Sequence, residues 1–238
     1  MTDVPATAAE YFGARAESYD SLIRRAVPRY DEMIGRLVAC LPPRAGTVLE
    51  LGCGTGNLSL ALARRYPHAR LVYVDASREM LELTAARLHA LDAGTRTEGL
   101  ECRFEDLPPG RADVDLVVSS ISMHHVARKG DLFRAVHGHL RPGGAFRWAD
   151  QLAGSTPALH AMIWEQWLEF CRLPGNCSEE EIQSLLDHAS AHDHYEPLPL
   201  HLGLLHDAGF VNVDCVWRNL MWTVVVADRP AEPPQPPG

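Results

Sequence analysis

The sequence predicts an α/β fold in which helices cover both faces of a seven-stranded, mostly parallel sheet. Two observations lead to this prediction. Between residues 48 and 150, short apolar runs typical of buried strands alternate with segments of helical periodicity. This alternation is typical of a parallel sheet, because consecutive parallel strands need a crossover helix between them. Two further apolar segments, 211–217 and 220–226, predict a closing antiparallel pair.

The composition indicates a globular protein with one substantial core. At 238 residues, with 46% hydrophobic and 22% charged residues, the chain has the length of one domain. Its formal net charge of −9 argues against nucleic acid as an obligatory partner, since phosphate binding relies on clustered Lys and Arg. Neither a secretory signal nor an apolar run near the roughly 20 residues of a membrane span is visible. Six scattered cysteines without a C-x-x-C pair suit reduced thiols, so we expect a cytoplasmic protein without a membrane partner.

The N-terminal segment, residues 1–44, is predicted to form a helical lid. Residues 6–24 mix alanine with aromatic side chains and suit a short helix. A second helix is expected after Pro28, where apolar residues from Tyr30 onward recur at spacings of about 3.6 until a proline pair ends it. Since both segments precede the first strand, they are placed where they can close over a ligand.

The first strand leads into a glycine-rich turn. Residues 48–51 form a short apolar run that contains one acid, and glycines follow at alternate positions, at Gly52, Gly54 and Gly56. Glycine suits a turn against which a ligand lies, and the start of the following helix favours a polar or anionic group. The dinucleotide fingerprint requires a sixth-position glycine, where this chain has Asn57. A phosphate-binding P-loop is also excluded, because no Gly-Lys-Ser/Thr follows.

The later elements follow in order. Ser77 is expected to cap the helix after the second strand, and Asp131 the helix after the fourth. Strands two to five are predicted at 71–75, 100–104, 113–119 and 145–150.

Residues 156–197 are predicted to form a helical insertion after the fifth strand, over the site. Thr156 opens an aromatic-rich helix, and Ser178 with Glu181 forms a capping box for another. A core helix is expected over 198–208, before the final strand pair. The Pro-rich tail, 228–238, is expected to be disordered.

Polar residues stand at the carboxyl ends of the predicted strands. In an open α/β sheet, ligands bind beyond these ends, where the strand order reverses. We therefore expect one crevice lined by the residues at those ends, which are the glycine turn, Asp75, Glu105, Asp106, Ser119 and Asp150.

Successive segments resemble the motifs of class I S-adenosylmethionine (SAM)-dependent methyltransferases. The matching segments are 48–56, 73–75, 104–106, 115–125 and 140–144, and the similarity covers roughly residues 11–227. The resemblance implies a Rossmann-like fold, a SAM-binding domain over residues 45–227, SAM as the cofactor and methyl transfer as the reaction. The motifs are specific for SAM and poorly specific for the acceptor.

Three carboxylates are given roles toward SAM. Asp75 is expected to accept hydrogen bonds from the ribose hydroxyls, and Glu50 to hold the ammonium of the methionine moiety. Asp106 is expected to accept from the adenine amino group while Leu107 packs on the ring. The complete predicted set of SAM-binding residues is Tyr19, Arg25, Tyr30, Glu50, Gly52, Gly54, Gly56, Asp75, Ala76, Met80, Glu105, Asp106, Leu107 and Ser119.

A finer similarity joins the chain to the branch that contains carboxy-SAM synthase and related small-molecule methyltransferases. Residues 25–30 and 205–210 look like segments of that branch. In such proteins the N-terminal Tyr-Asp pair and the Arg-x-Val-Pro-x-Tyr segment lie near the methionine end of SAM. The resemblance therefore implies Tyr19, Arg25 and Tyr30 as contacts.

The reaction requires an acceptor that is aligned with the methyl group and freed of its proton. His124 and His125, just past the fourth strand, are candidate bases because imidazole titrates near neutral pH. Either histidine can instead be a satisfied structural group. Asp150, at the end of the fifth strand, is expected to hold a polar group of the acceptor. No metal is expected, because the histidines of residues 188–206 show no recognised ligand spacing.

The predicted activity is methyl transfer to an O or N atom of a small-molecule acceptor, such as a secondary metabolite. Three alternatives remain at this point: an enzyme that modifies or cyclises SAM itself, a tRNA or protein methyltransferase, and a SAM-binding module without catalysis. A homodimer is compatible with the sequence, which does not determine the oligomeric state.

Overall fold

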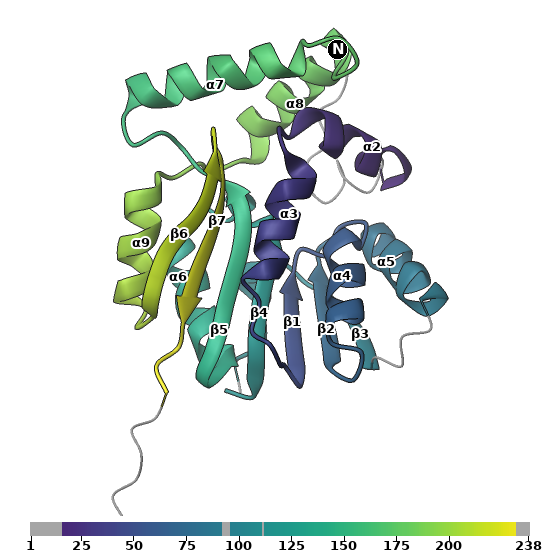
Figure 1. Ribbon diagram of the computed structural model, residues 1–238, viewed down its shortest axis with the longest axis vertical. Coiled ribbons are helices and arrows are strands. Elements are labelled where there is room, and N and C mark those ends of the chain that lie inside the picture. The colour runs from purple at the N-terminus through teal and green to yellow at the C-terminus, as the bar shows by residue number, and fades with distance from the viewer. Residues whose placement is uncertain (1–15, 92–95, 111, 232–238) are drawn as a thin grey trace, which may run out of the picture.

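The computed structural model describes residues 16–91, 96–110 and 112–231. It contains one seven-stranded sheet with the order β3-β2-β1-β4-β5-β7-β6 (Figure 1). β7 runs antiparallel to β5 and β6, and the other neighbouring pairs are parallel. The predicted fold class is confirmed. The strands are β1 (Thr47–Leu51), β2 (Arg70–Asp75), β3 (Arg96–Glu101), β4 (Val114–Ser120), β5 (Leu140–Gln151), β6 (Val211–Asn219) and β7 (Trp222–Asp228).

Helices cover both faces of the sheet, as Figure 1 shows. One face carries α3 (Tyr30–Ala39), α4 (Asn57–Arg65) and α5 (Arg78–Ala90), and the other carries α6 (Lys129–His139) and α9 (Leu198–Asp207). Because both faces are covered, the central strands are apolar along nearly their whole length. Two buried clusters result, one built around Met33, Leu37 and Leu62, the other around Phe133 and Leu205.

Most of the predicted boundaries hold, and three do not, the first being the start of the fifth strand, at Leu140 instead of residue 145. Ser77 caps α5 and Ser178 with Glu181 forms the capping box of α8, as predicted. Asp131 is not a cap, because α6 already begins at Lys129 and leaves Asp131 in its first turn. The third strand lies earlier than the predicted 100–104, because β3 is a largely exposed edge strand without the apolar run that identifies a buried one.

Three helices lie beyond the carboxyl ends of the strands. They are α2 (Ala16–Ala26), α7 (Pro157–Cys171) and α8 (Glu179–His192), at the top of Figure 1. The predicted insertion therefore corresponds to α7 and α8. The two helices of the predicted lid lie in different places. α3 packs its buried Met33 and Leu37 toward the sheet, against β5 and β7, whereas α2 lies above the strand ends. Residues 1–15 of the predicted lid and 232–238 of the predicted tail lie outside the described residues.

No helix in the described ranges combines the length and the apolar content that a bilayer crossing requires.

Candidate functional site

A cavity of about 490 Å³ opens at the carboxyl ends of the central strands. It lies where the strand order reverses, between β1 and β4, the position at which open α/β sheets bind ligands. Its wall includes the glycine turn, the end of β2, the segment after β3, the loop after β4 and residues of α2 and α8. The crevice predicted from the strand ends is therefore present.

The glycine turn requires glycine at both of its ends. Gly52 has a φ of +74°, and a Cβ placed there would lie 2.3 Å from Oγ of Ser122. Gly56 has a φ of +87°, and a Cβ there would lie 2.9 Å from Oγ1 of Thr84. Gly54, between them, lines the cavity with no atom within 4 Å of where a Cβ would be. The turn thus packs tightly against the protein while its middle faces the ligand space.

Asp75 is fixed against this turn at the end of β2. Its carboxylate accepts hydrogen bonds from the backbone N–H of Gly54 at 2.9 Å and of Ser77 at 3.0 Å. Burial raises the pKa of Asp75 above its ordinary value, while these backbone donors act in the opposite direction. The carboxylate lines the cavity with lone pairs left for further donors, and its role toward the ribose hydroxyls stays a prediction.

Glu50 is a buried acid that also lines the cavity, with 1% of its surface exposed. Its Oε2 accepts a hydrogen bond of 2.5 Å from Ser59, and Oε1 has no hydrogen-bond partner among the described residues. Burial raises the pKa of Glu50 to about 8. An unpartnered carboxyl oxygen in such a place suits a cationic ligand group, and the ammonium of SAM is one.

The segment after β3 supplies a different set of residues than predicted. Glu105 lines the cavity, together with the unpredicted Phe104. Asp106 is exposed and Leu107 packs into a hydrophobic cluster, so neither is placed at the cavity wall. The reason is the short helical turn η1 (Phe104–Asp106), which rotates successive side chains away from one another. Ala76 and Met80 do line the cavity, as predicted.

Ser119 lies behind the cavity wall rather than in it. Its side chain is fully buried and donates a hydrogen bond of 2.8 Å to the carbonyl of Leu51, and its Oγ lies 2.8 Å from Oγ of Ser122. The residue therefore ties β4 to the end of β1. Its neighbour Ser120 lines the cavity instead, because successive residues of a strand face opposite sides.

Of the three residues predicted from the lid, Tyr19 and Tyr30 line the cavity and Arg25 does not. Arg25 forms a two-pronged pair with Glu181, at 2.6 and 2.8 Å, and donates to the carbonyl of Asn176 at 2.6 Å. It therefore joins α2 to α8. Burial raises the pKa of Tyr19, and its hydroxyl is neutral at physiological pH.

Asp20 is a residue of the site that sequence reasoning did not select. Its carboxylate accepts hydrogen bonds from Thr55, from Nδ2 of Asn57 at 2.8 Å and from Arg87 at 2.9 Å. These contacts fasten α2 directly onto the glycine turn and α5. The available signal was its place in the Tyr-Asp pair beside Tyr19.

The predicted catalytic residues differ in whether they reach the cavity. His125 lines the cavity, whereas His124 and Asp150 are buried and do not. Nδ1 of His124 lies 2.6 Å from Oδ1 of Asp150, and its backbone N–H donates to Oδ2 at 3.0 Å. Asp150 therefore orients His124 instead of reaching the acceptor space.

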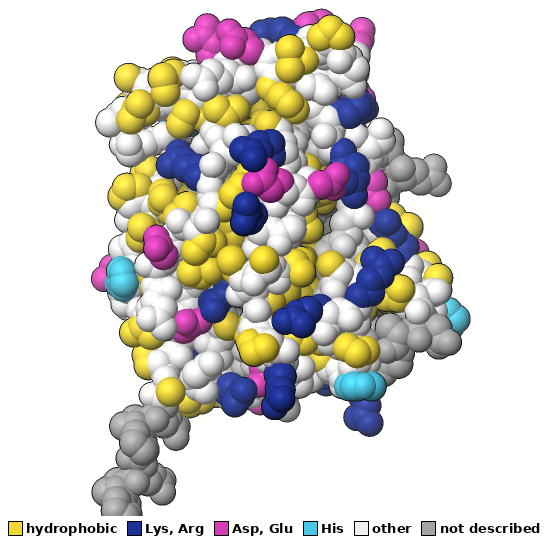
Figure 2. Space-filling model, viewed as in Figure 1, with side chains coloured by type: hydrophobic (Ala, Val, Ile, Leu, Met, Phe, Trp, Pro, Cys, Tyr) yellow, Lys and Arg dark blue, Asp and Glu magenta, His cyan; other side chains and the backbone are white. Residues whose placement is uncertain are grey.

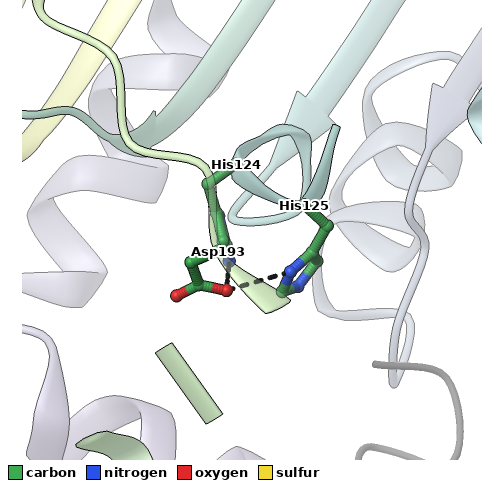
Figure 3. A group of neighbouring side chains, drawn as sticks. All are labelled: His124, His125 and Asp193. Carbon is green, nitrogen blue, oxygen red and sulfur yellow. Dashed lines mark ion pairs between the residues drawn. The ribbon is translucent and has the colours of Figure 1, made fainter. Parts of the chain in front are cut away.

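Asp193 and Lys129 complete this region, and the sequence analysis selected neither. Oδ2 of Asp193 accepts a hydrogen bond from the Tyr195 hydroxyl, and Oδ1 lies 3.1 Å from Nδ1 of His125 (Figure 3). The ammonium of Lys129 is buried and donates to the carbonyls of residues 124, 126 and 194. Burial alone would raise the pKa of Asp193, but His124 and His125 outweigh it and hold this pKa below its ordinary value. The histidine-rich segment was the only sequence signal for this part of the site.

Comparison with known proteins finds a matching family model and relatives that share one name. Residues 48–144 match a family model described as a methyltransferase domain. A carboxy-S-adenosyl-L-methionine synthase of Aeromonas hydrophila is 25% identical over 223 residues, covering 92% of this chain and 89% of the relative. The relative from Salmonella paratyphi C, with the same name, is 28% identical over 203 residues, covering 82% and 81%.

Solved methyltransferases share the fold. An O-methyltransferase family protein of Burkholderia thailandensis superposes with a TM-score of 0.67 at 20% identity, covering 97% of this chain and 65% of that one. An N-methyltransferase of Haemonchus contortus, solved with S-adenosylhomocysteine, also gives 0.67, at 16% identity, covering 93% and 58%.

Proposed function

We propose that this chain, a class I SAM-dependent methyltransferase, transfers the methyl group of SAM to an O or N atom of a small-molecule acceptor. The size of the cavity and the residues of its wall carry the proposal. A space of about 490 Å³ extends from the glycine turn to His125 and to Ala191, His192 and His194, with α2 contributing to its wall. This volume is within the range of small-molecule sites, roughly 300–1,000 Å³, and it must hold SAM as well. A compact acceptor suits the remainder better than a polymer.

The residues of the wall divide between holding SAM and excluding water. The glycine turn and Asp75 suit the nucleoside, and Glu50 suits the ammonium. Tyr19 and Tyr30 line the cavity and suit the methionine end of SAM. The sulfonium of SAM supplies an electrophilic methyl group, so the main requirement on the protein is alignment in a dry site.

The transfer is a displacement at the methyl carbon. A lone pair of the acceptor forms the new O–C or N–C bond while the C–S bond breaks, which releases S-adenosylhomocysteine and leaves a proton to be removed from the acceptor. His125 is the imidazole of the predicted pair that faces the cavity. His125 forms a cluster with His124 and Asp193, and we assign removal of the acceptor's proton to this cluster. We assign the positioning of His124 to Asp150.

The cytoplasmic location expected from the sequence belongs to the same proposal. All six cysteines are free thiols, which suits a reducing compartment.

The acceptor class can be tested by fractionating a cell extract by molecular size. We expect S-adenosylhomocysteine to form, and label from methyl-labelled SAM to appear in a new compound, only with the low-molecular-weight fraction. Asp75→Ala protein is the control for release that does not depend on bound SAM. Transfer of label only to the macromolecular fraction would overturn the small-molecule proposal in favour of tRNA or protein.

A second candidate is supported by the relatives, which carry the name of an enzyme that makes a carboxylated SAM. The alignments with them span most of both chains. In that case SAM is itself the substrate. Mass spectrometry of SAM incubated with the protein and the same small-molecule fraction distinguishes the two, since a SAM-derived product other than S-adenosylhomocysteine appears only for the second.

A further inference from the structure

We infer that His124, His125 and Asp193 form a site for one divalent transition-metal ion, such as Zn²⁺, Co²⁺ or Fe²⁺, at the wall of the cavity. One ligand atom of each residue lies within 4.8 Å of the other two. Figure 3 shows both imidazoles directed at the same carboxylate oxygen. The ligands come from two distant segments, the loop after β4 and the residue that follows α8, which is why spacing along the sequence did not predict a site.

The two oxygen–nitrogen separations, 3.1 and 3.7 Å, lie on either side of the distance expected between ligands around a shared ion. Oδ1 of Asp193 lies 3.1 Å from Nδ1 of His125 and 3.7 Å from Nε2 of His124. Bonds of about 2.0–2.2 Å in tetrahedral geometry place neighbouring ligand atoms roughly 3.3–3.5 Å apart. A direct hydrogen bond from nitrogen would need about 2.7–3.2 Å. The longer separation, from His124, is beyond hydrogen-bond distance, and a small inward movement of the imidazole would bring it to the distance expected around an ion.

The burial of Asp193 is a second, independent observation. Only 2% of its side chain is exposed, and imidazole nitrogens surround Oδ1, at 3.1 Å from His125, 3.6 Å from His188 and 3.7 Å from His124. The other oxygen, Oδ2, is fixed by Tyr195 and by Nε2 of Gln151 at 3.5 Å. A cation placed among these nitrogens would stabilise the buried carboxylate, because burying a charge is unfavourable unless the charge is paired.

The residues behind the ligands provide the support that metal sites use. Asp150 contacts Nδ1 of His124 at 2.6 Å, which leaves Nε2 directed at the oxygen of Asp193. Carboxylate–histidine–metal arrangements orient the imidazole and strengthen it as a ligand in this way. Lys129 donates to the carbonyls of residues 124, 126 and 194 and so holds both ligand segments together. Nε2 of His188 lies 3.6 Å from the same oxygen, outside the convergent group.

Two histidines and one carboxylate leave coordination positions open, a pattern typical of metal centres that bind a substrate or water. His125 lines the cavity, so such a position can face the acceptor. An acceptor oxygen or nitrogen bound there would lose its proton more easily. This role rests on the proposed function, whereas binding of the ion does not.

Metal content of tag-free protein tests the site directly. The protein is treated with a chelator, loaded separately with Zn²⁺ and Co²⁺, desalted, and analysed by elemental mass spectrometry and by visible absorption of bound Co²⁺. We expect one ion per chain and the intense absorption of low-coordinate Co²⁺. His125→Gln should weaken binding more than tenfold, and Asp150→Asn roughly 10- to 100-fold as the loss of a supporting carboxylate.

His206→Gln is the matched control, because His206 is an exposed histidine on α9, and its affinity should equal that of the wild type. Circular dichroism and SAM calorimetry on the same samples show whether each variant is folded. Substoichiometric metal in the wild type, or equal binding by His125→Gln, would overturn the site. Methyl transfer by metal-free protein would show that the ion has no catalytic role and would leave the proposed function intact. One bound ion per chain without any methyl transfer would support the metal site and count against the proposed function.

Discussion

At the scale of single residues, Glu50 and Asp75 show how the environments of two carboxylates in the wall of one cavity differ. Asp75 is held by backbone donors, whereas Glu50 has one hydroxyl partner and an oxygen without any among the described residues. Burial therefore raises the pKa of Glu50 to about 8. In the absence of SAM the folded protein carries this acid in its neutral form near pH 7.

The pH dependence of stability follows from Glu50. Between its ordinary value of 4.5 and the folded pKa of about 8, the folded state binds more protons than the unfolded state. Stability without SAM should therefore fall as the pH rises through this window, by an amount on the order of a few kcal/mol. Urea unfolding at pH 6 and pH 8 measures the fall. Glu50→Gln should flatten it and weaken SAM binding, and an equally steep fall in this variant would show that another group is responsible.

The two predicted nucleotide-binding acids should behave differently. Asp75→Ala should abolish SAM binding in calorimetry, because Asp75 lines the cavity and also holds the glycine turn. Asp106→Ala is the matched control, since Asp106 is exposed and outside the wall, and its affinity should stay within about threefold of wild type, under 1 kcal/mol. A large loss in Asp106→Ala would restore the adenine role predicted from the sequence.

At the scale of elements, α2 is held by two separate anchors. Asp20 connects it to the glycine turn and α5, and Arg25 connects it to α8. Both anchors are partly exposed, so solvent screening limits what each contributes to global stability. Their effect is local, because they determine whether the lid stays over the cavity. The Ser77 cap of α5 and the capping box of α8 were predictable from residues that are close in the chain, whereas these anchors were not.

Loosening α2 should change the affinity for SAM more than it changes the free energy of unfolding. Asp20→Ala removes the shared partner of Asn57 and Arg87, so hydrogen exchange in residues 16–26 should accelerate and SAM affinity should fall about tenfold or more, near 1.4 kcal/mol. Arg24→Ala is the control, because Arg24 pairs with Asp31 on the surface. Unchanged exchange in Asp20→Ala would show that the lid has other anchors.

At the scale of the whole molecule, the charge distribution bears on the acceptor. The net charge is −9, and over α2 and α3 basic and acidic side chains lie side by side (Figure 2). Several of these are paired with each other, including Arg24 with Asp31 and Arg29 with Glu32. Paired arginines are less available to phosphate groups than a free basic stripe would be.

Nucleic-acid binding should accordingly be weak. In filter binding with bulk tRNA at about 150 mM salt, we expect no saturable binding with a Kd below about 10⁻⁶ M. This value is the tightest that is typical of non-specific binding. A tRNA-binding protein of similar size provides the positive control. Saturable binding whose affinity falls steeply between about 50 and 200 mM salt would indicate phosphate contacts and would favour the tRNA alternative.

The sequence by itself determined the fold class, the glycine turn and the acid at the end of β2. These features depend on residues that are adjacent in the chain: hydrophobic periodicity, turn chemistry and the position of an acid after an apolar run. Side chains that follow strand ends therefore reached the cavity at Asp75, Glu105 and His125.

The tertiary structure alone decided which side chains converge. It placed Asp193 against His124 and His125, Asp20 against the glycine turn and Arg25 against Glu181, while Ser119 lies behind the wall. These contacts join segments that are far apart in the chain, and they depend on the paths of loops beyond the strand ends. Local pattern does not encode those paths, because long-range packing sets the direction in which each loop returns and therefore which polar groups are buried together.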